Sequence, residues 1–142
     1  MKKIINKFCK QFGVSAHKGK DWHAYPNKIY YPKSEKKYNS VGFMELINAH
    51  YPDVRASEFT WSLLHEIGHA QTWNEFTKKE WKQYAKKAPH THDLEEYYQI
   101  PQEKRATDWA YSYIKAHPKK IAKFEKKIQK ALSDAYTLYE TT

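Results

Sequence analysis

Apolar side chains recur at helical spacing in several separate segments of the chain, with polar or proline-containing stretches between them. The first segment predicts a helix over residues 3–12 that ends at Gly13. Its inward face consists of Ile4, Ile5, Phe8 and Phe12. The other segments predict helices over residues 57–73, 77–87, 101–116 and 118–139. The chain is therefore expected to be rich in helix.

A different pattern occupies residues 21–32, where aromatic and β-branched residues surround the turn signal Pro26-Asn27. This pattern predicts two short strands joined by a turn. Residues 34–40 are polar and predict a loop, and residues 41–50 predict a strand followed by a helical turn. Residues 88–99 lack a clear period and predict a long loop of the kind that borders a cleft.

The last predicted helix, residues 118–139, has apolar residues on one face and lysines on the other. Its apolar positions are Ile121, Phe124, Ile128, Leu132, Ala135 and Tyr139. This pattern predicts an ordinary packing helix, with an oligomer seam as the alternative. We expect residues 1–142 to form a single domain, because the length is typical of one domain and no linker or repeat divides it.

Composition narrows the class of protein. Hydrophobic residues make up 40% of the chain and aromatic residues 16%, which excludes a disordered polypeptide. Cys9 is the single cysteine, so an internal disulfide and a multi-cysteine zinc site are both excluded. The N-terminal apolar run is broken by polar residues, which is not typical of a signal peptide, and no segment resembles a membrane span. We expect a cytoplasmic protein without a membrane partner.

The formal net charge of +9 allows an acidic partner such as nucleic acid. Most of the lysines, however, fall on solvent-facing positions of predicted helices, where charge usually serves solubility. No recognised nucleic-acid module is present. We therefore expect nucleic-acid binding to be weak and non-specific.

The strongest chemical signal lies in the helix over residues 57–73, where His65, Glu66 and His69 form the pattern H-E-x-x-H. Two histidines four residues apart share one helix face, so both imidazoles can bind one Zn²⁺ ion. Glu66 follows the first ligand and can act as the base for a zinc-bound water. The alternative is two exposed histidines beside a surface glutamate.

A catalytic zinc site needs a third protein ligand. The arrangement H-E-x-x-H-x-x-G-x-x-H is disfavoured, because Thr72 and Glu75 occupy its glycine and third-histidine positions. The remaining candidates are His90, His92, Asp93, Glu95, Glu96, Glu103 and Asp108. Glu103 is favoured because small residues, Ala106 and Ala110, share its helix face and allow close helix approach. Two alternatives remain, which are a third ligand from residues 90–96 and a water that completes the site.

The segments F-T-W-S-L-L-H-E-I-G-H-A (59–70) and E-K-R-A-T-D-W-A-Y-S-Y-I (103–114) resemble the ImmA/IrrE-type zinc metallopeptidases. These gluzincin-like domains are common in bacteria, phages and mobile elements. The resemblance implies a helix-rich α+β, zincin-like fold with a small, mostly antiparallel three-stranded sheet beside the H-E-x-x-H helix. It also implies that His65, His69 and Glu103 bind zinc and that Glu66 is the catalytic base.

The implied activity is hydrolysis of peptide bonds in a protein or peptide substrate. A second electrophile usually assists such a reaction, and the candidates are His92, Tyr97 and Tyr98, although the tyrosines can equally serve packing. Substrate is expected to pair with an edge strand, for which residues 28–31 are the candidate. The alternatives are a metal-binding interaction module without proteolysis and a basic, nucleic-acid-associated phage accessory protein.

Overall fold

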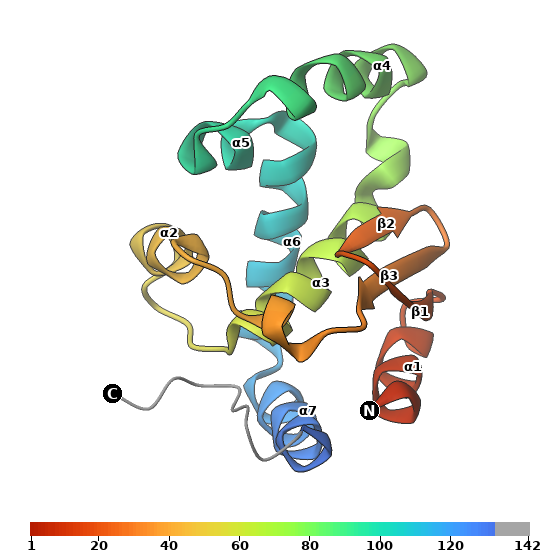
Figure 1. Ribbon diagram of the computed structural model, residues 1–142, viewed down its shortest axis with the longest axis vertical. Coiled ribbons are helices and arrows are strands. Elements are labelled where there is room, and N and C mark those ends of the chain that lie inside the picture. Colours follow the sequence, from red (N-terminus) through yellow and green to blue (C-terminus); the bar gives the residue numbers. More distant parts are fainter. Residues whose placement is uncertain (133–142) are drawn as a thin grey trace.

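The computed structural model describes residues 1–132 and has a helix-rich α+β fold (Figure 1). The longer elements are α1 (Lys2–Lys10), β1 (Ser15–Gly19), β2 (His23–Tyr25), β3 (Lys28–Pro32), α2 (Phe43–His50), α3 (Glu58–Thr72), α4 (Lys78–Lys87), α5 (Leu94–Gln99), α6 (Pro101–Ala116) and α7 (Pro118–Ala131). Short 3-10 helices are η1 (Glu35–Tyr38), η2 (Trp73–Glu75) and η3 (Ala88–His90). Over residues 1–132, no helix has the length and apolar character needed to cross a membrane.

The three-stranded sheet has the order β1-β3-β2 and is mixed. The predicted hairpin is confirmed, because β2 and β3 are antiparallel and flank the turn at residues 26–27. The expectation of a mostly antiparallel sheet is wrong, since β1 pairs with β3 in parallel over five residues. The chain reverses direction after β1 and again after β2, and β3 then inserts between them. This order makes β3 the central strand.

The sequence predicted a strand at the start of residues 41–50, but the third strand of the sheet lies elsewhere in the chain. Phe43 begins helix α2, and the preceding Gly42 has a φ of 87°, a left-handed conformation that glycine adopts readily. Phe43 and Ile47 are buried four residues apart on one face, which is the spacing of a helix. The third strand is instead β1, whose polar sequence S-A-H-K-G buries only Ala16.

The predicted long loop at residues 88–99 is also wrong, because this segment contains η3 and α5. Asp93 caps α5, since its side chain accepts a hydrogen bond from the Glu96 backbone N–H at 2.9 Å. The six residues of α5 are too few to show a helical period in the sequence. The capping residue Asp93 was therefore the clearer sequence signal for this helix. By contrast, the helix predicted over residues 77–87 is present as α4, and a capping box of Thr77 and Glu80 begins it.

The C-terminal helix α7 ends at Ala131, earlier than the predicted end at residue 139. Its predicted apolar face is confirmed where it is described, because Ile121, Phe124 and Ile128 are buried. Residues 133–142, which include the predicted positions Ala135 and Tyr139, lie outside the described residues.

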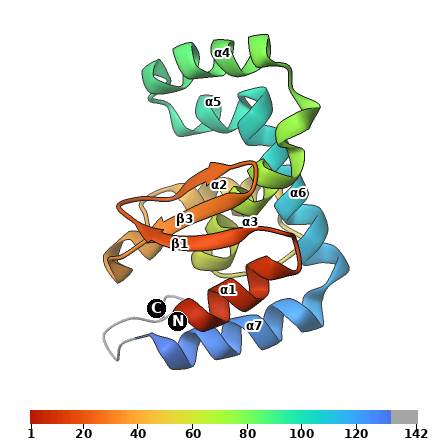
Figure 2. The same ribbon diagram turned by 90° about the vertical axis from the view of Figure 1, so that its right-hand side faces the viewer.

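Helix α3 lies at the centre of the molecule, with α6 crossing it on one side and the sheet on another (Figures 1 and 2). Ser57 caps the helix by accepting a hydrogen bond from the Thr60 backbone N–H at 3.1 Å. Buried residues occur all round α3 and include Phe59, Trp61 and Leu64. A helix covered on most sides holds its side chains rigidly, which suits the precise placement of a functional group.

Helices α3 and α6 approach closely at Gly68. A Cβ atom at this position would lie 2.5 Å from the backbone oxygen of Ala106. We therefore expect Gly68→Ala to lower the free energy of unfolding by about 2 kcal/mol, because overpacking outweighs the roughly 1 kcal/mol gain in helix propensity. Thermal unfolding should show a drop of about 6 °C in Tm.

The matched control for Gly68→Ala is Gly13→Ala. Gly13 has a φ of 69° and no heavy atom within 4 Å of an added Cβ, so alanine there suffers backbone strain without a clash. The control substitution should lower the free energy of unfolding by about 1 kcal/mol and leave the α3–α6 contact intact. A Gly68→Ala protein at least as stable as the unsubstituted chain would contradict the described contact.

Candidate metal centre

Three buried side chains from α3 and α6 converge at one point. His65 Nε2 lies 3.0 Å from one carboxylate oxygen of Glu103, and His69 Nε2 lies 2.7 Å from the other. The ligand atoms of the three residues all lie within 4.8 Å of one another, so the group could hold a metal ion. Over residues 1–132 it is the one cluster of three such side chains that meets this criterion.

The sequence explains this convergence. His65 and His69 are one turn apart on α3 and therefore share a face. Glu103 lies in the first turn of α6, where Pro101 begins the helix. The small residues predicted to let the two helices approach do so, since Ala106 is fully buried and its backbone lies against Gly68.

Thr107 fixes the tautomer of His65. Its hydroxyl donates to the backbone carbonyl of Glu103 at 2.9 Å, and its oxygen lies 2.9 Å from Nδ1 of His65. A hydroxyl has a single hydrogen, so His65 must supply the proton shared with Thr107 from Nδ1. When the imidazole carries no second hydrogen, the lone pair of Nε2 points toward Glu103.

That arrangement leaves two acceptors, His65 Nε2 and Glu103 Oε1, only 3.0 Å apart. Two lone pairs at hydrogen-bond distance require a shared cation, which either a proton or a metal ion can supply. Tyr84 further restrains the carboxylate, because its hydroxyl donates to the second oxygen of Glu103 at 2.9 Å. The donor geometry therefore fits a metal ion held by His65, His69 and Glu103.

The electrostatics of the cluster favour an ionised carboxylate on Glu103. Burial alone would raise the pKa of Glu103, but its contacts with His65 and His69 hold the pKa well below the ordinary value. Burial alone would lower the pKa of His69, but the hydrogen bond to Glu103 leaves that pKa raised. A carboxylate that stays ionised in the interior is the form that binds a cation.

Glu66 lies beside these three residues in an open cavity of about 340 Å³, which is also lined by His69 and Glu103. Desolvation raises the pKa of the Glu66 carboxyl above its ordinary value. The cavity has aromatic walls formed by Trp22, Trp73, Trp81, Tyr84 and Tyr97. Glu66 is therefore the carboxyl group placed to exchange a proton with a molecule bound beside the cluster.

The three candidate electrophiles have different positions. Tyr97 lines the cavity, and its hydroxyl lies 3.4 Å from that of Tyr84. Tyr98 packs against the rings of His65 and Phe43, with centroid separations of 5.5 and 5.6 Å. His92 is exposed and does not line the cavity. Of these candidates, the structure brings Tyr97 to the cavity.

The phenols at the cavity keep their protons at neutral pH. Burial is the main cause that raises the pKa of both Tyr84 and Tyr97 above the ordinary value, and the nearby Glu103 carboxylate adds to it. Both hydroxyls are thus hydrogen-bond donors.

The other acidic candidates for the third ligand are engaged elsewhere or exposed. Asp108 accepts hydrogen bonds from Tyr51 at 2.5 Å and Lys104 at 3.0 Å. Glu95 lies 2.6 Å from His50 on the surface. The exposed remaining candidates also lie outside the cluster: His90, His92, Asp93 and Glu96. Among the candidates weighed from the sequence, the structure brings Glu103 to the histidines.

Two features of the site were not predicted from the sequence. Residues 28–31 were expected to form an edge strand, but β3 is central, and the edge strand that lines the cavity is β2, through His23 and Ala24. The contacts of Tyr84 and Thr107 were also missed. Thr107 lies one turn after Glu103 on α6, so its spacing was an available signal.

Comparisons with protein-family models, with curated proteins and with solved structures find no match to this chain. The resemblance to ImmA/IrrE-type metallopeptidases therefore depends on the residues of α3 and α6 themselves.

Proposed function

We propose that this protein is a zinc-dependent peptidase that hydrolyses peptide bonds of a protein substrate. The observation that carries the proposal is the buried convergence of His65, His69 and Glu103 next to Glu66 at an open cavity. Two imidazoles and one carboxylate are a donor set typical of catalytic zinc, and a fourth position is left for water.

The ligand separations are compatible with zinc. Three ligands about 2.1 Å from a tetrahedral ion lie about 3.4 Å from one another. The two observed N···O contacts, 3.0 and 2.7 Å to different oxygens of Glu103, differ from that separation by about 0.7 Å or less, and the ligand atoms of all three residues lie within 4.8 Å of one another. When bound, zinc would supply a polarised water and stabilise negative charge on the substrate carbonyl.

The residues of the chain supply the proton transfers. Glu66 accepts the proton of the attacking water, and desolvation, which raises the pKa of its carboxyl, makes the carboxylate a stronger base. The same carboxyl group then donates the proton to the leaving amine. Tyr97 lines the cavity, and its protonated hydroxyl can donate a hydrogen bond to the carbonyl oxygen as negative charge develops.

Strand β2 provides the place for the substrate backbone. It is an edge strand, and His23 and Ala24 line the same cavity as Glu66. An extended peptide can pair with the free edge of β2 and present its carbonyl to the metal centre. The aromatic walls from Trp73 and Trp81 would then contact its side chains.

The proposed activity predicts metal-dependent cleavage of an unfolded polypeptide. The zinc-loaded protein is incubated with a mixture of unfolded proteins, and new peptide termini are identified by mass spectrometry. Cleavage should disappear after treatment with 1,10-phenanthroline and return when zinc is added. Cleavage that survives removal of the metal contradicts the proposal. Zinc binding without any cleavage favours a metal-binding interaction module instead.

A further inference from the structure

The excess positive charge of the chain is confined to two helices that are distant in sequence. Helices α1 and α7 together carry ten lysines and one glutamate, so the rest of the chain has fifteen basic and fifteen acidic residues. The net charge of +9 is therefore the charge of α1 and α7 alone. The single glutamate, Glu125, faces inward and accepts hydrogen bonds from Ser57 and Thr60.

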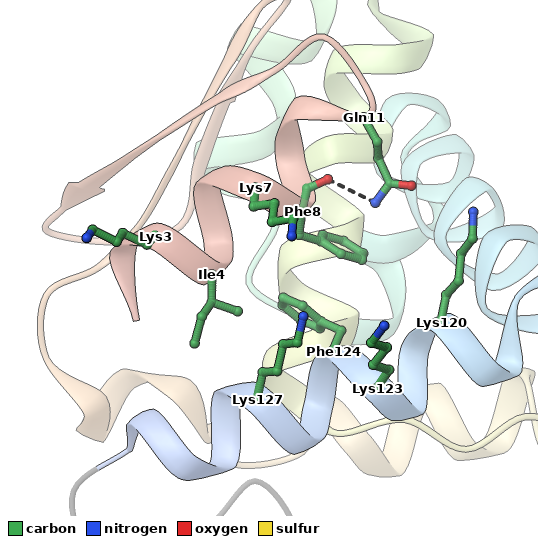
Figure 3. A pocket seen from close by; sticks show the side chains of 9 residues that line it. All are labelled: Lys3, Ile4, Lys7, Phe8, Gln11, Lys120, Lys123, Phe124 and Lys127. Carbon is green, nitrogen blue, oxygen red and sulfur yellow. Dashed lines mark hydrogen bonds between the residues drawn. The ribbon is translucent and has the colours of Figure 1, made fainter.

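The two helices lie side by side, at the end of the molecule opposite α4 and α5 (Figure 2). They meet through the rings of Phe8 and Phe124, whose centroids are 4.2 Å apart. Between the helices runs an open groove of about 430 Å³. Figure 3 shows the Phe8 and Phe124 side chains between the two helices, with Ile4 nearby and lysine side chains from both helices around them, and the two phenylalanines are buried. The groove is thus apolar below and basic at its rim.

Five lysines form this rim: Lys3, Lys7, Lys120, Lys123 and Lys127. No acidic residue lines the groove, and none of the five forms an ion pair with another residue in the part of the chain that the structure describes. Like charges facing one another across a groove repel, and an acidic ligand would relieve that repulsion. The rim is therefore complementary to a partner with negative charges on both sides of an apolar strip.

We propose that the groove between α1 and α7 binds an acidic amphipathic helix of a protein partner. The apolar side chains of that helix would lie over Ile4, Phe8 and Phe124, and glutamates or aspartates on its flanks would meet the lysines. The bound helix would pack against α1 and α7 as a third helix. The proposal does not depend on the metal centre or on peptide hydrolysis.

The same features disfavour a nucleic acid and a membrane surface. The rings of Phe8 and Phe124 pack against each other with centroids 4.2 Å apart, so these faces are not available for a base to stack on. Insertion into a lipid surface needs apolar side chains that protrude beyond the charges, whereas here Phe8 and Phe124 are buried and the lysines are exposed. A recessed apolar floor instead accepts apolar side chains that project from a partner.

The test uses a fluorescein-labelled peptide of about 18 residues, with leucines on one helix face and glutamates elsewhere. Its affinity for the full-length protein is measured by fluorescence anisotropy at about 0.15 M salt. A scrambled peptide of the same composition has the same charge but no apolar face. We expect micromolar binding of the amphipathic peptide and at least about tenfold weaker binding of the scrambled one.

Two double variants with the same change in charge locate the binding surface. Lys7→Glu with Lys123→Glu, one from each wall of the groove, should weaken peptide binding by about tenfold or more. Lys78→Glu with Lys79→Glu, in the exposed first turn of α4, should change it by less than about twofold. Circular dichroism and Tm establish that both variants fold.

Several outcomes would overturn the inference. These are equal binding of the two peptides, equal loss in the two double variants, or no binding of the amphipathic peptide up to millimolar concentration. Tighter binding of a single-stranded oligonucleotide of matched charge would assign the groove to nucleic acid. Tighter binding of vesicles containing phosphatidylserine would assign it to a membrane surface.

Discussion

Replacement of Glu66 by glutamine is expected to abolish peptide hydrolysis while the protein keeps its metal. Glutamine has nearly the same size as glutamate, but its amide cannot accept the proton of the attacking water. Glu66 lines the cavity without belonging to the cluster of His65, His69 and Glu103, so the ligands are unchanged. The rate of cleavage should fall by about 100-fold or more, the effect of removing a general base.

The matched comparison is His65→Ala, which should lose both the metal and the activity because a ligand is removed. Zinc content and cleavage rate are measured on both variants and on the unsubstituted protein. If Glu66→Gln cleaves a substrate at the original rate, Glu66 is not the base. If it also loses zinc, its carboxylate has a structural role at the centre.

Replacement of Glu103 by alanine is expected to weaken zinc binding by more than about 100-fold, since loss of a direct ligand should cost more than loss of an outer-shell partner. The substitution also removes the carboxylate that both histidines and Tyr84 contact. A competition titration against a chromogenic chelator measures the affinity. Circular dichroism separates loss of the site from loss of the fold.

Two controls make the Glu103 experiment specific. Asp108→Ala removes an acidic residue from a different face of α6, where it contacts Tyr51 and Lys104. Glu96→Ala removes an exposed carboxylate from α5. Both variants should bind zinc as the unsubstituted protein does. A titration in which Glu96→Ala loses zinc and Glu103→Ala retains it would overturn the ligand assignment.

The candidate site could be predicted from the sequence because its determinants are local or periodic. His65 and His69 are one turn apart, and Glu103 shares its helix face with the small residue Ala106, so helical geometry alone restricts where they point. Tyr84 could not be assigned in this way. It lies nineteen residues from Glu103 on α4, and only the path of the chain through α5 brings the two together.

The errors in the fold have a similar origin. Strand β1 buries only Ala16, so its sequence lacks the alternation that signals a strand, and pairing with β3 stabilises it. Parallel pairing with β3 depends on contacts distant in sequence, which local patterns do not encode. The apolar positions of residues 43–50 are compatible with either a strand or a helix. In the structure Phe43 and Ile47 are buried on one face, which is the spacing of a helix.

The central claim is that His65, His69 and Glu103 form a metal centre. It is tested most directly by the metal content of the protein purified without added metal, measured by inductively coupled plasma mass spectrometry. We expect about one zinc ion per chain, and a lower Tm after chelation, because an ion bound only by the folded state stabilises it. A content far below one ion per chain that does not rise when zinc is supplied would contradict the claim.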